Sequence, residues 1–577
     1  MLKYQTYMMK FTLPRLKYYL GDKMVETLIE WSPNNETLLT KSRLISMIDS
    51  LRGKSIFKDR EFRKDLLLTM DPKEILCIRD NCLSAKEKAE NDPIKLIDII
   101  VKKTWGKNKT SCFLLNMWGI TEDIFTTETV ETNDISTIGM CSDHFYELLD
   151  YQYYIKQRAL YNLNSGNLQE RLFIHMPTGT GKTKTSMHTI VNYMNFTLKK
   201  QGLVIWIAHT NELLQQAYDT FVNVWGHLGD GECTAYKLWG NNDIDDLSNQ
   251  LNGIAFCGLA KLMSVYDSNP ALMERLKRDC RLIVFDEAHK AGATKTRTVV
   301  ESLMRMPAGY ENRALIGLSA TPGRTTEASY DNSHLSHMFG NKLIHIDSDI
   351  LNQINMGRLQ ALNTVAEENI IRYFQERRIL SKITAEKLEY QTEFSSNELA
   401  ILSQQLEDYG FEEKEFSDKQ LQVFAENKDR NKAIMEKLRT LYNEKVPTIV
   451  FACSVPHAKM LSAMLTLEGI DNSLVISEMN PVERKKAIDA FKDNTNSTNI
   501  IINYEVLTTG FDSKNIRCVF IARPTHSVVL YSQMLGRGLR GPMMGGNEEC
   551  LLVDIEDNLQ AFDNESAFSH FNDYWRV

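Results

Sequence analysis

The chain has 577 residues, a formal net charge of −8 and ordinary fractions of hydrophobic and charged residues, a composition typical of a soluble globular protein. Its length predicts roughly three or four domains of about 150 residues each. The negative charge excludes an overall basic surface, so any nucleic-acid binding must come from local patches, and no apolar stretch approaches the roughly 20 residues of a membrane span.

Cysteine usage and the first residues indicate a reducing compartment. Cys77 and Cys82 are the closest pair, and the sequence contains no CxxC motif and no Cys/His cluster. The N-terminus also lacks the charged-then-apolar design of a signal peptide. We therefore expect a cytoplasmic protein without structural zinc and without a membrane partner.

Residues 1–120 are predicted to form a mainly helical N-terminal domain, because amphipathic stretches recur in them. Within this segment, residues 52–64 are a basic run interleaved with Phe57 and Phe62. Such a run can follow a nucleic-acid backbone, but a solvated helix face with its aromatic rings in the core is more common, and we favour it. Residues 121–142 are rich in Thr, Glu, Asp and Asn and predict a linker.

Strand-like and helical stretches alternate over residues 143–364, which predicts a parallel sheet covered by helices. Residues 365–430 are charged and helical in pattern, so they predict a helical insertion without strands. The alternation resumes over residues 431–577 and predicts a second unit of the same kind. The expected fold class is therefore α/β, with two tandem parallel-sheet domains, a helical N-terminal domain and a helical insertion between the two sheets.

A phosphate-binding motif lies in the first α/β unit. Residues 176–183 read Met-Pro-Thr-Gly-Thr-Gly-Lys-Thr, after an apolar strand and before a helix. Backbone N–H groups of such a turn point at phosphates, Lys182 would reach the β- and γ-phosphates, and the Thr183 hydroxyl would bind Mg²⁺. Met176 stands where the strict pattern has Gly, so a plain tight turn is the alternative.

The second motif, Val-Phe-Asp-Glu-Ala-His at residues 284–289, also follows an apolar strand. That strand would deliver Asp286 and Glu287 to the C-terminal edge of a sheet, where ligands bind in open α/β folds. Asp286 would hold Mg²⁺, and Glu287 would orient and deprotonate the attacking water. Two acids can also be a solvated strand end, but both motifs in this order predict an ATPase.

Two arginines mark the second unit. Residues 533–540 read Gln-Met-Leu-Gly-Arg-Gly-Leu-Arg, which places Arg537 and Arg540 on one helical face. Planar guanidinium groups suit a transferring phosphoryl group, although two solvated arginines are the alternative. In the first unit, Ser319-Ala320-Thr321 could couple the nucleotide to a polynucleotide site, but taken alone it is more typical of a helix cap.

As an ordered set, these motifs resemble those of superfamily 2 helicases. The set also includes Gln152, Trp206 to Ala217, residues 451–454 and Leu-Thr-Thr-Gly-Phe-Asp at 507–512. It is similar to DEAH-containing helicase subunits of restriction enzymes and to related DNA repair and bacterial defence translocases. The resemblance covers about residues 143–560 and implies two RecA-like domains with ATP in the cleft between them.

The resemblance implies roles for further residues at the nucleotide. Gln152 would read the adenine edge, with an ordinary surface glutamine as the alternative. Gly510 would let the chain pass close to the nucleotide, and Asp512 would contact the ribose. Gln533 and Arg537 would meet the γ-phosphate, and Arg540 would be the arginine finger. The phosphate cradle would comprise Pro177, Thr178, Gly179, Thr180, Gly181, Lys182 and Thr183.

The same resemblance implies contacts with a sugar–phosphate backbone, which position a strand without reading its sequence. The matching residues are His209, Thr210, Ser454, Thr508 and Thr509. The expected function is an ATP- and Mg²⁺-dependent DNA helicase or translocase, acting in antiviral defence or DNA repair. The alternatives are an RNA helicase, or a nucleotide-gated scaffold that recruits an effector such as a nuclease. Lys182, Glu287 and Arg540 argue for turnover rather than a scaffold, and DNA cutting would need a partner protein.

Overall fold

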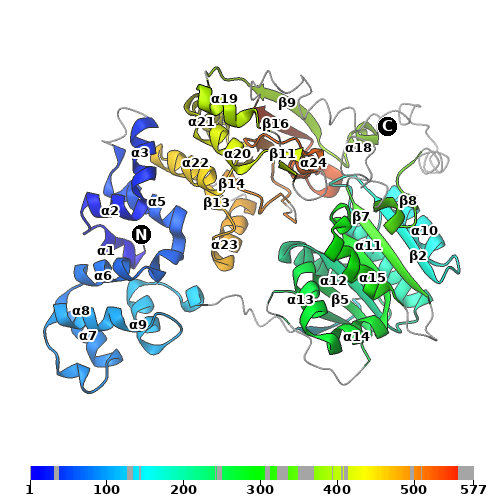
Figure 1. Ribbon diagram of the computed structural model, residues 1–577, viewed down its shortest axis with the longest axis horizontal. Helices are drawn as coiled ribbons and strands as arrows, with labels where there is room; N and C mark the ends of the chain where they lie inside the picture. Colours follow the sequence, from blue (N-terminus) through cyan, green and yellow to red (C-terminus); the bar gives the residue numbers. More distant parts are fainter. Residues whose placement is uncertain are drawn as a thin grey trace.

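The structure is a computed structural model, shown in Figure 1. It describes residues 2–31, 38–125, 134–141, 145–240, 242, 250–305, 312–320, 335–347, 370–392, 394–404, 407–408, 414–493, 499–508, 510–511 and 513–555. None of the helices in these ranges is long and apolar enough to cross a membrane.

The N-terminal domain is helical, as predicted. Its helices begin at capping residues such as Thr12, Thr40 and Asp71, whose side chains accept a hydrogen bond from the first turn. Its main elements are α1 (Lys3–Met8), α2 (Leu13–Leu20), α3 (Asp22–Trp31), α5 (Lys41–Arg52), η1 (Gly53–Lys58), α6 (Arg60–Thr69), α7 (Pro72–Cys82), α8 (Pro93–Lys102) and α9 (Lys109–Trp118).

The basic run of this domain supports its core. Phe57 and Phe62 are buried and stack edge-to-face with their ring centroids 5.4 Å apart. Arg63 is buried as well. Its guanidinium is satisfied there, since it donates to the Phe57 and Lys58 carbonyls and lies 4.5 Å from the Trp105 ring. The interpretation as a helix face with its aromatic rings in the core is therefore confirmed, and Arg63 is a structural residue.

The first α/β domain has an eight-stranded sheet in the order β1-β4-β5-β3-β6-β7-β2-β8. Its strands are β1 (Ile135–Ile138), β2 (Gln169–His175), β3 (Leu203–Ala208), β4 (Cys233–Leu238), β5 (Gly253–Gly258), β6 (Cys280–Asp286), β7 (Arg313–Ser319) and β8 (Leu343–Ile344). All neighbours pair in parallel except β1, which pairs antiparallel with β4. The segment predicted as a linker over residues 121–142 thus contributes an edge strand, which is a correction.

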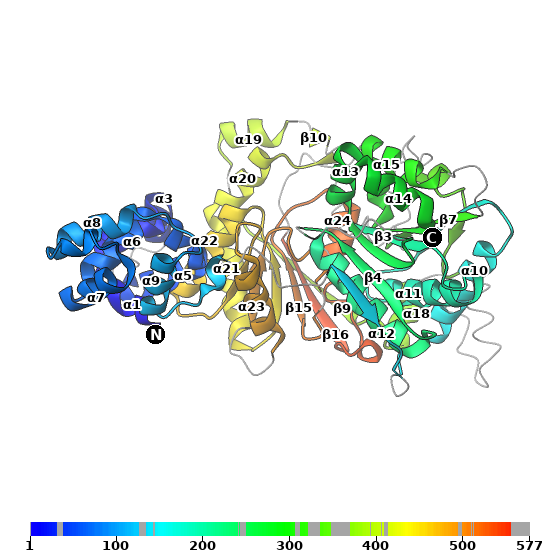
Figure 2. The same cartoon turned by 90° about the horizontal axis from the view of Figure 1, so that it is seen from below.

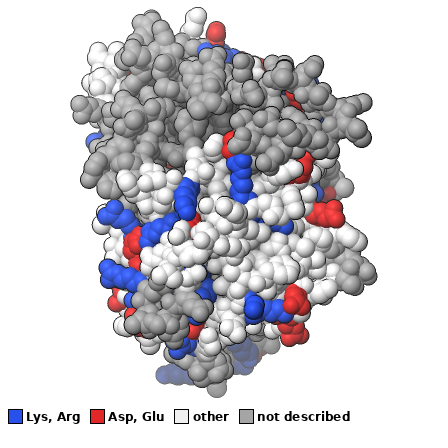
Figure 3. Space-filling model, turned by 90° about the vertical axis from the view of Figure 1, so that its right-hand side faces the viewer, with Lys and Arg blue, Asp and Glu red and all other residues white. Residues whose placement is uncertain are grey.

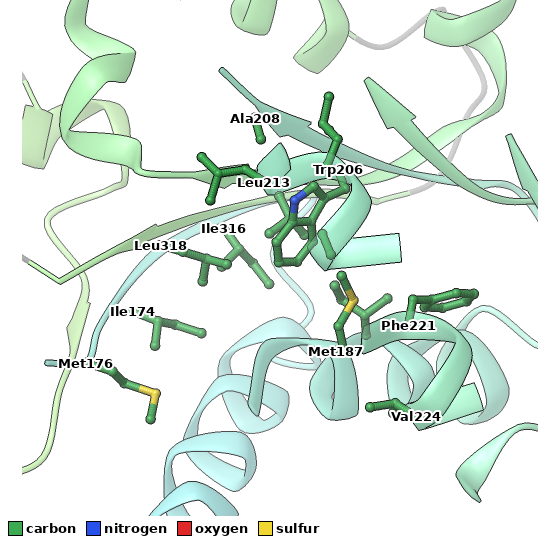
Figure 4. Packing of buried hydrophobic residues seen from close by; sticks show 14 of the residues in the cluster. Ile174, Met176, Met187, Trp206, Ala208, Leu213, Phe221, Val224, Ile316 and Leu318 are labelled. Carbon is green, nitrogen blue, oxygen red and sulfur yellow. The ribbon is translucent and has the colours of Figure 1, made fainter. Parts of the chain in front are cut away.

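Helices cover both faces of this sheet. One face packs against α10 (Asp150–Leu163), α11 (Lys182–Asn192) and α12 (Asn211–Leu228), and the other against α13 (Leu259–Ser268), α14 (Pro270–Asp279) and α15 (Thr294–Met304). Met187 of α11, Phe221 of α12 and Trp206 of β3 belong to one hydrophobic cluster, shown in Figure 4. This packing fixes the carboxyl ends of the strands, where the candidate site residues lie.

The second α/β domain has six parallel strands in the order β13-β14-β12-β15-β16-β9. They are β9 (Lys382–Leu388), β12 (Thr448–Phe451), β13 (Ser473–Val475), β14 (Ile500–Asn503), β15 (Cys518–Ile521) and β16 (Glu549–Ile555). The domain's helices include α21 (Lys428–Asn443), α22 (Val455–Leu467), α23 (Pro481–Lys492) and α24 (Val528–Leu535).

The prediction of a strandless helical insertion over residues 365–430 is wrong. β9 lies in this range and pairs in parallel with β16 over seven residues. Each residue of β9 is exposed or half-buried, as in an edge strand, so β9 lacks the apolar run of a central strand. The charged residues around it gave the range a helical appearance. Around β9 lie α18 (Ile370–Glu376), α19 (Ser396–Leu402), the short pair β10 (Glu407–Asp408) and β11 (Lys414–Glu415), and α20 (Asp418–Glu426).

The N-terminal domain packs against the second α/β domain, with which it shares one hydrophobic core (Figure 2). Helix α5 lies against α22, and the Ser50 and Ser462 hydroxyls are 3.3 Å apart across this contact. The Lys54 backbone N–H donates to Glu483 at the start of α23 over 2.7 Å. These contacts tie the N-terminal domain to the second sheet.

Candidate active site between the two sheets

The phosphate loop joins β2 to α11 and has the backbone shape that the motif requires. Gly179 and Gly181 have φ of +84° and +83°, a left-handed conformation that favours glycine. A Cβ atom at Gly181 would lie 2.3 Å from the Gln152 amide nitrogen. The Thr180 hydroxyl donates to the Pro177 carbonyl over 2.7 Å, which closes the turn. Lys182 then begins α11, so the N-terminal N–H groups of the helix face the loop.

Lys182 and the two acids of the second motif are together in space. The Lys182 Nζ lies 2.9 Å from Glu287 Oε1 and 3.6 Å from Asp286 Oδ1. The Asp286 side chain is buried, while those of Lys182 and Glu287 are 12% and 14% exposed. Burial raises the pKa of Asp286 to about 6. Burial acts the same way on Glu287, but the Lys182 ammonium outweighs it and lowers the pKa of Glu287 to about 2. Glu287 is therefore an ionised carboxylate at neutral pH.

A short network links this motif to the next strand. Glu287 has a φ of +54°, which is unusual for a residue with a side chain and costs of order 1–3 kcal/mol. His289 Nδ1 lies 3.0 Å from the Ser319 hydroxyl and 3.4 Å from Glu287 Oε2. The ends of β6 and β7 are thus connected through His289, a residue for which the motif alone predicted no role. Thr321, the last residue of the Ser-Ala-Thr motif, lies outside the described residues.

Gln152 is buried, so the alternative of an ordinary surface glutamine is wrong. Its amide nitrogen donates to the Thr180 carbonyl over 2.9 Å, and its amide oxygen accepts from the Leu149 backbone. The Tyr151 hydroxyl donates to the same Thr180 carbonyl over 2.7 Å. The first turn of α10 therefore holds the phosphate loop through two hydrogen bonds to Thr180. Contact of Gln152 with adenine stays a prediction.

The second α/β domain supplies the opposite wall. Arg537 donates to the Gln533 and Phe511 carbonyls, which fixes its guanidinium beside the loop that contains Gly510. The Gln533 amide nitrogen is buried without a hydrogen-bond partner among the described residues. A buried N–H group without a partner is costly, so it marks a position at which an oxygen-rich ligand would fit.

Both walls enclose one cleft of about 950 Å³. The predicted residues that line it are Pro177, Thr178, Gly179, Gly181, Lys182, Thr183, Asp286, Glu287, Gly510, Gln533, Arg537 and Arg540. Glycine N–H groups, one lysine and two arginines fit a triphosphate, and the Thr183 and Asp286 oxygens are hard ligands that Mg²⁺ accepts. Asp512 lies outside the described residues.

The two walls contact each other beside the cleft. A Cβ atom at Gly536 would lie 2.2 Å from Thr178 Cγ2, and one at Gly510 would lie 3.2 Å from the Leu213 nitrogen. Both glycines thus allow a close approach of the two domains. Arg484 of α23 also donates to Glu212 of α12, with 3.0 Å between Nη1 and Oε1.

The candidate nucleic-acid residues are partly engaged in local structure. Thr210 and Ser454 cap α12 and α22, where their hydroxyls accept from backbone N–H groups. His209 packs its ring against Phe285, Thr508 is buried, and Thr509 lies outside the described residues. On the face of the molecule in Figure 3, basic and acidic side chains are interspersed. Contact of these residues with a strand stays a prediction.

The two α/β domains match known families. Residues 145–324 match the family described as "Type III restriction enzyme, res subunit", and residues 429–541 match the "Helicase conserved C-terminal domain". These ranges contain the phosphate loop and the arginine pair, respectively. The matches confirm two RecA-like domains, and helicase domains of these kinds imply that the cleft binds ATP.

Three relatives illustrate the similarity. IRC3 of Saccharomyces cerevisiae, named as an ATP-dependent helicase, is 24% identical over 415 residues, which are 71% of this chain and 51% of IRC3. The ATP-dependent DNA helicase fml1 of Schizosaccharomyces pombe is 25% identical over 194 residues, 33% of this chain and 21% of fml1. The DEAD-box ATP-dependent RNA helicase 13 of Arabidopsis thaliana is 33% identical over 111 residues, 19% of this chain and 13% of that protein.

The chain thus spans about half the length of IRC3 and smaller shares of the other two proteins. Two helicase domain families, in this order and on opposite sides of one cleft, place the chain among the superfamily 2 helicases, a family of ATP-dependent enzymes.

Proposed function

We propose that the protein is a DNA-stimulated ATPase that moves along DNA or separates its strands. The observation that carries this proposal is the division of one cleft between two domains. Lys182, Asp286 and Glu287 lie on one wall, and Gln533, Arg537 and Arg540 lie on the other. A ligand held by both walls would couple its own hydrolysis to their separation.

The residues of the first wall have the chemistry for hydrolysis. Lys182 would bind the β- and γ-phosphates, and Thr183 with Asp286 would hold Mg²⁺. The metal, when bound, would neutralise phosphate charge and polarise the terminal phosphoryl group. Glu287 is ionised at neutral pH, so its carboxylate can orient the attacking water and accept its proton.

The second wall would complete the site. Arg537 and Gln533 would donate to γ-phosphate oxygens, and Arg540 would stabilise the charge that develops in the transition state. An arginine in this role can contribute roughly 10³ to 10⁵ in rate. Because these groups come from the second domain, hydrolysis would be fast only while the two domains are together.

DNA is the track that we favour. The family matched by the first domain is described as a restriction-enzyme subunit, and fml1 is named as a DNA helicase. Restriction, antiviral defence or DNA repair would then be the process that the motor serves in the cytoplasm, with a nuclease or other effector as a separate partner. The match to an RNA helicase over 111 residues keeps RNA as the second candidate track.

A strand-displacement assay tests this proposal. The assay compares forked DNA, blunt duplex DNA, single-stranded tails and an RNA duplex of the same sequence, each with ATP and Mg²⁺. Displacement of DNA strands, abolished by Lys182→Ala, is the expected result. Displacement confined to the RNA duplex would replace DNA by RNA as the track, and binding without ATP turnover would favour the scaffold.

A further inference from the structure

A short connector joins the first domain to the edge strand of the second. It begins at Tyr373 in α18 and ends at Ser381, directly before β9. Arg377 donates from both of its terminal nitrogens to the two Asp150 oxygens, each over 2.8 Å. It also donates to the Tyr373 hydroxyl over 2.6 Å. Asp150 begins α10, so this bidentate pair fixes the connector to the helix that supports the phosphate loop.

The connector also contacts the phosphate loop itself. Leu380 is fully buried, and a Cβ atom at Gly179 would lie 3.1 Å from its Cδ2 atom. The same position of Gly179 would be 3.7 Å from the Leu539 Cβ atom. Leu380 and Leu539, the residue before Arg540, therefore both lie close to the phosphate loop at Gly179.

The connector holds the Arg540 backbone on both sides. Leu380 and Arg540 form an antiparallel bridge, in which Ser381 N–H donates to the Leu539 carbonyl and Gly541 N–H donates to the Ile379 carbonyl, each over 2.9 Å. The Ser381 hydroxyl lies 2.8 Å from the Arg540 carbonyl and 2.8 Å from the Asn547 carbonyl. Ser381 is fully buried, so this hydroxyl serves the backbone around Arg540 and not the solvent.

We propose that Ser381 is a positioning residue for hydrolysis, which sets where the Arg540 side chain enters the cleft. Its hydroxyl fixes the Arg540 peptide, while Arg377 and Leu380 hold the same connector against the phosphate-loop side. The connector thus contacts both halves of the site and fixes the distance between them. The inference rests on the proposed role of Arg540 at the transition state.

Loss of one hydroxyl contact should affect turnover more than binding. We expect Ser381→Ala to lower kcat on the order of 3- to 10-fold, the loss that one hydrogen bond supports. The KM for ATP should stay within about twofold, because the phosphate loop keeps its own contacts. In an Arg540→Ala background, Ser381→Ala should cause no further loss, because the two residues would act in series.

The experiment measures kcat and KM for MgATP, with and without DNA, in the full chain. It uses Ser381→Ala, Arg540→Ala and the double variant, with Ser462→Ala as the matched control. Ser462 is equally buried in the same domain, and its hydroxyl donates to Asn472 over 2.7 Å on the side facing the N-terminal domain. Its replacement should lower stability as Ser381→Ala does while leaving kcat unchanged.

The outcomes separate the inference from the proposed function. If Arg540→Ala leaves kcat unchanged, the proposed role of Arg540 fails. If Arg540→Ala lowers kcat but Ser381→Ala behaves like Ser462→Ala, or adds its loss to that of Arg540→Ala, the inference is overturned. Should Ser381→Ala not fold, Arg377→Lys tests the other end of the connector, where Arg377 pairs with Asp150. It keeps the charge but loses the bidentate pair, and it should lower kcat in the same non-additive way.

Discussion

Arg484 and Glu212 form an ion pair across the cleft, with 3.0 Å between Arg484 Nη1 and Glu212 Oε1. Arg484 lies in the first turn of α23 in the second domain, and Glu212 lies in the first turn of α12 in the first domain. Arg484 also donates to the Ser477 carbonyl over 3.1 Å, which orients its guanidinium. The pair exists only while the two domains are together, so it favours the closed cleft.

Breaking this pair should make closure less favourable. We expect Arg484→Ala to lower kcat/KM for ATP about 1.4- to 5-fold, since a partly exposed pair contributes roughly 0.2–1 kcal/mol. Steady-state ATPase assays check this, and the charge swap Glu212→Arg with Arg484→Glu should recover part of the loss. An equal loss in the single and swapped variants would show that the residues act separately.

Lys182→Ala should abolish ATP hydrolysis, because it removes the cation for the β- and γ-phosphates. The structure adds a second expectation: Asp286 and Glu287 lose their counter-ion, and one of these buried carboxylates should then bind a proton near neutral pH. ATPase assays and chemical unfolding at pH 6 and pH 8 check the two effects. Retained turnover would contradict the assignment of the phosphate loop.

Glu287→Gln should keep ATP and nucleic-acid binding but lose most of its turnover, because an amide cannot accept the water proton. The amide still accepts a hydrogen bond from Lys182, so the fold should persist. Measured affinity for ATP together with the rate of a single turnover checks this. Turnover at the normal rate would mean that another residue activates the water.

One methyl group added at Gly53, where the N-terminal domain contacts α23, should destabilise the protein. Gly53 has a φ of +48°, and a Cβ atom there would lie 2.7 Å from Glu483 Oε2. We expect Gly53→Ala to lower the free energy of unfolding by about 1–3 kcal/mol, because strain adds to the disturbed Lys54–Glu483 contact. Gly21→Ala is the matched control, since Gly21 has a φ of +98° but no neighbour within 4 Å. Equal losses of unfolding free energy in the two variants, measured with urea, would mean that the Glu483 contact does not stabilise this interface.

Acid should destabilise the second domain through His457. Burial and the nearby Arg430 charge lower the pKa of His457 to about 3, while the same imidazole titrates near 6.5 in the unfolded chain. Below pH 6.5 the unfolded state therefore binds a proton that the folded state excludes. His457 therefore does not lower the free energy of unfolding above about pH 6.5. Below that pH the free energy of unfolding falls by about 1.4 kcal/mol per pH unit, down to about pH 3.

Urea unfolding between pH 4 and pH 7 checks this expectation. The His457 Nδ1 atom accepts from the Cys453 backbone N–H, and Nε2 donates to the Asn431 side-chain oxygen. His457→Gln is therefore a conservative replacement, because an amide can also accept and donate. It should flatten the slope of stability against pH relative to the unmodified chain. An unchanged slope would assign the acid sensitivity to other groups.

Local patterns were enough to predict the central strands of both sheets and the first wall of the cleft, whereas the second wall was predicted from the resemblance to superfamily 2 helicases. Each motif follows an apolar strand, and the carboxyl ends of parallel strands share one edge, so Lys182 and Glu287 were expected together. Contacts between distant residues could not be predicted in this way. Arg377 and Asp150 are 227 residues apart, and Ser381 and Arg540 are 159 apart. Neither pair carries a local signal.

Edge strands carry the weakest local signal in this sequence. β9 and β1 are partly exposed and polar, so they lack the apolar runs that revealed the central strands. Gln152 shows a related limit, because its burial against the phosphate loop depends on how α10 packs and not on its own neighbours in sequence.

The ATP hydrolysis rate of the full chain should be measured with single-stranded DNA, duplex DNA, forked DNA and RNA, using Glu287→Gln as the blank, because nucleic-acid stimulation is what defines the proposed motor. We expect strong stimulation by at least one form of DNA and little by RNA. Hydrolysis that no nucleic acid stimulates would contradict a nucleic-acid motor and indicate an ATPase controlled by a partner protein.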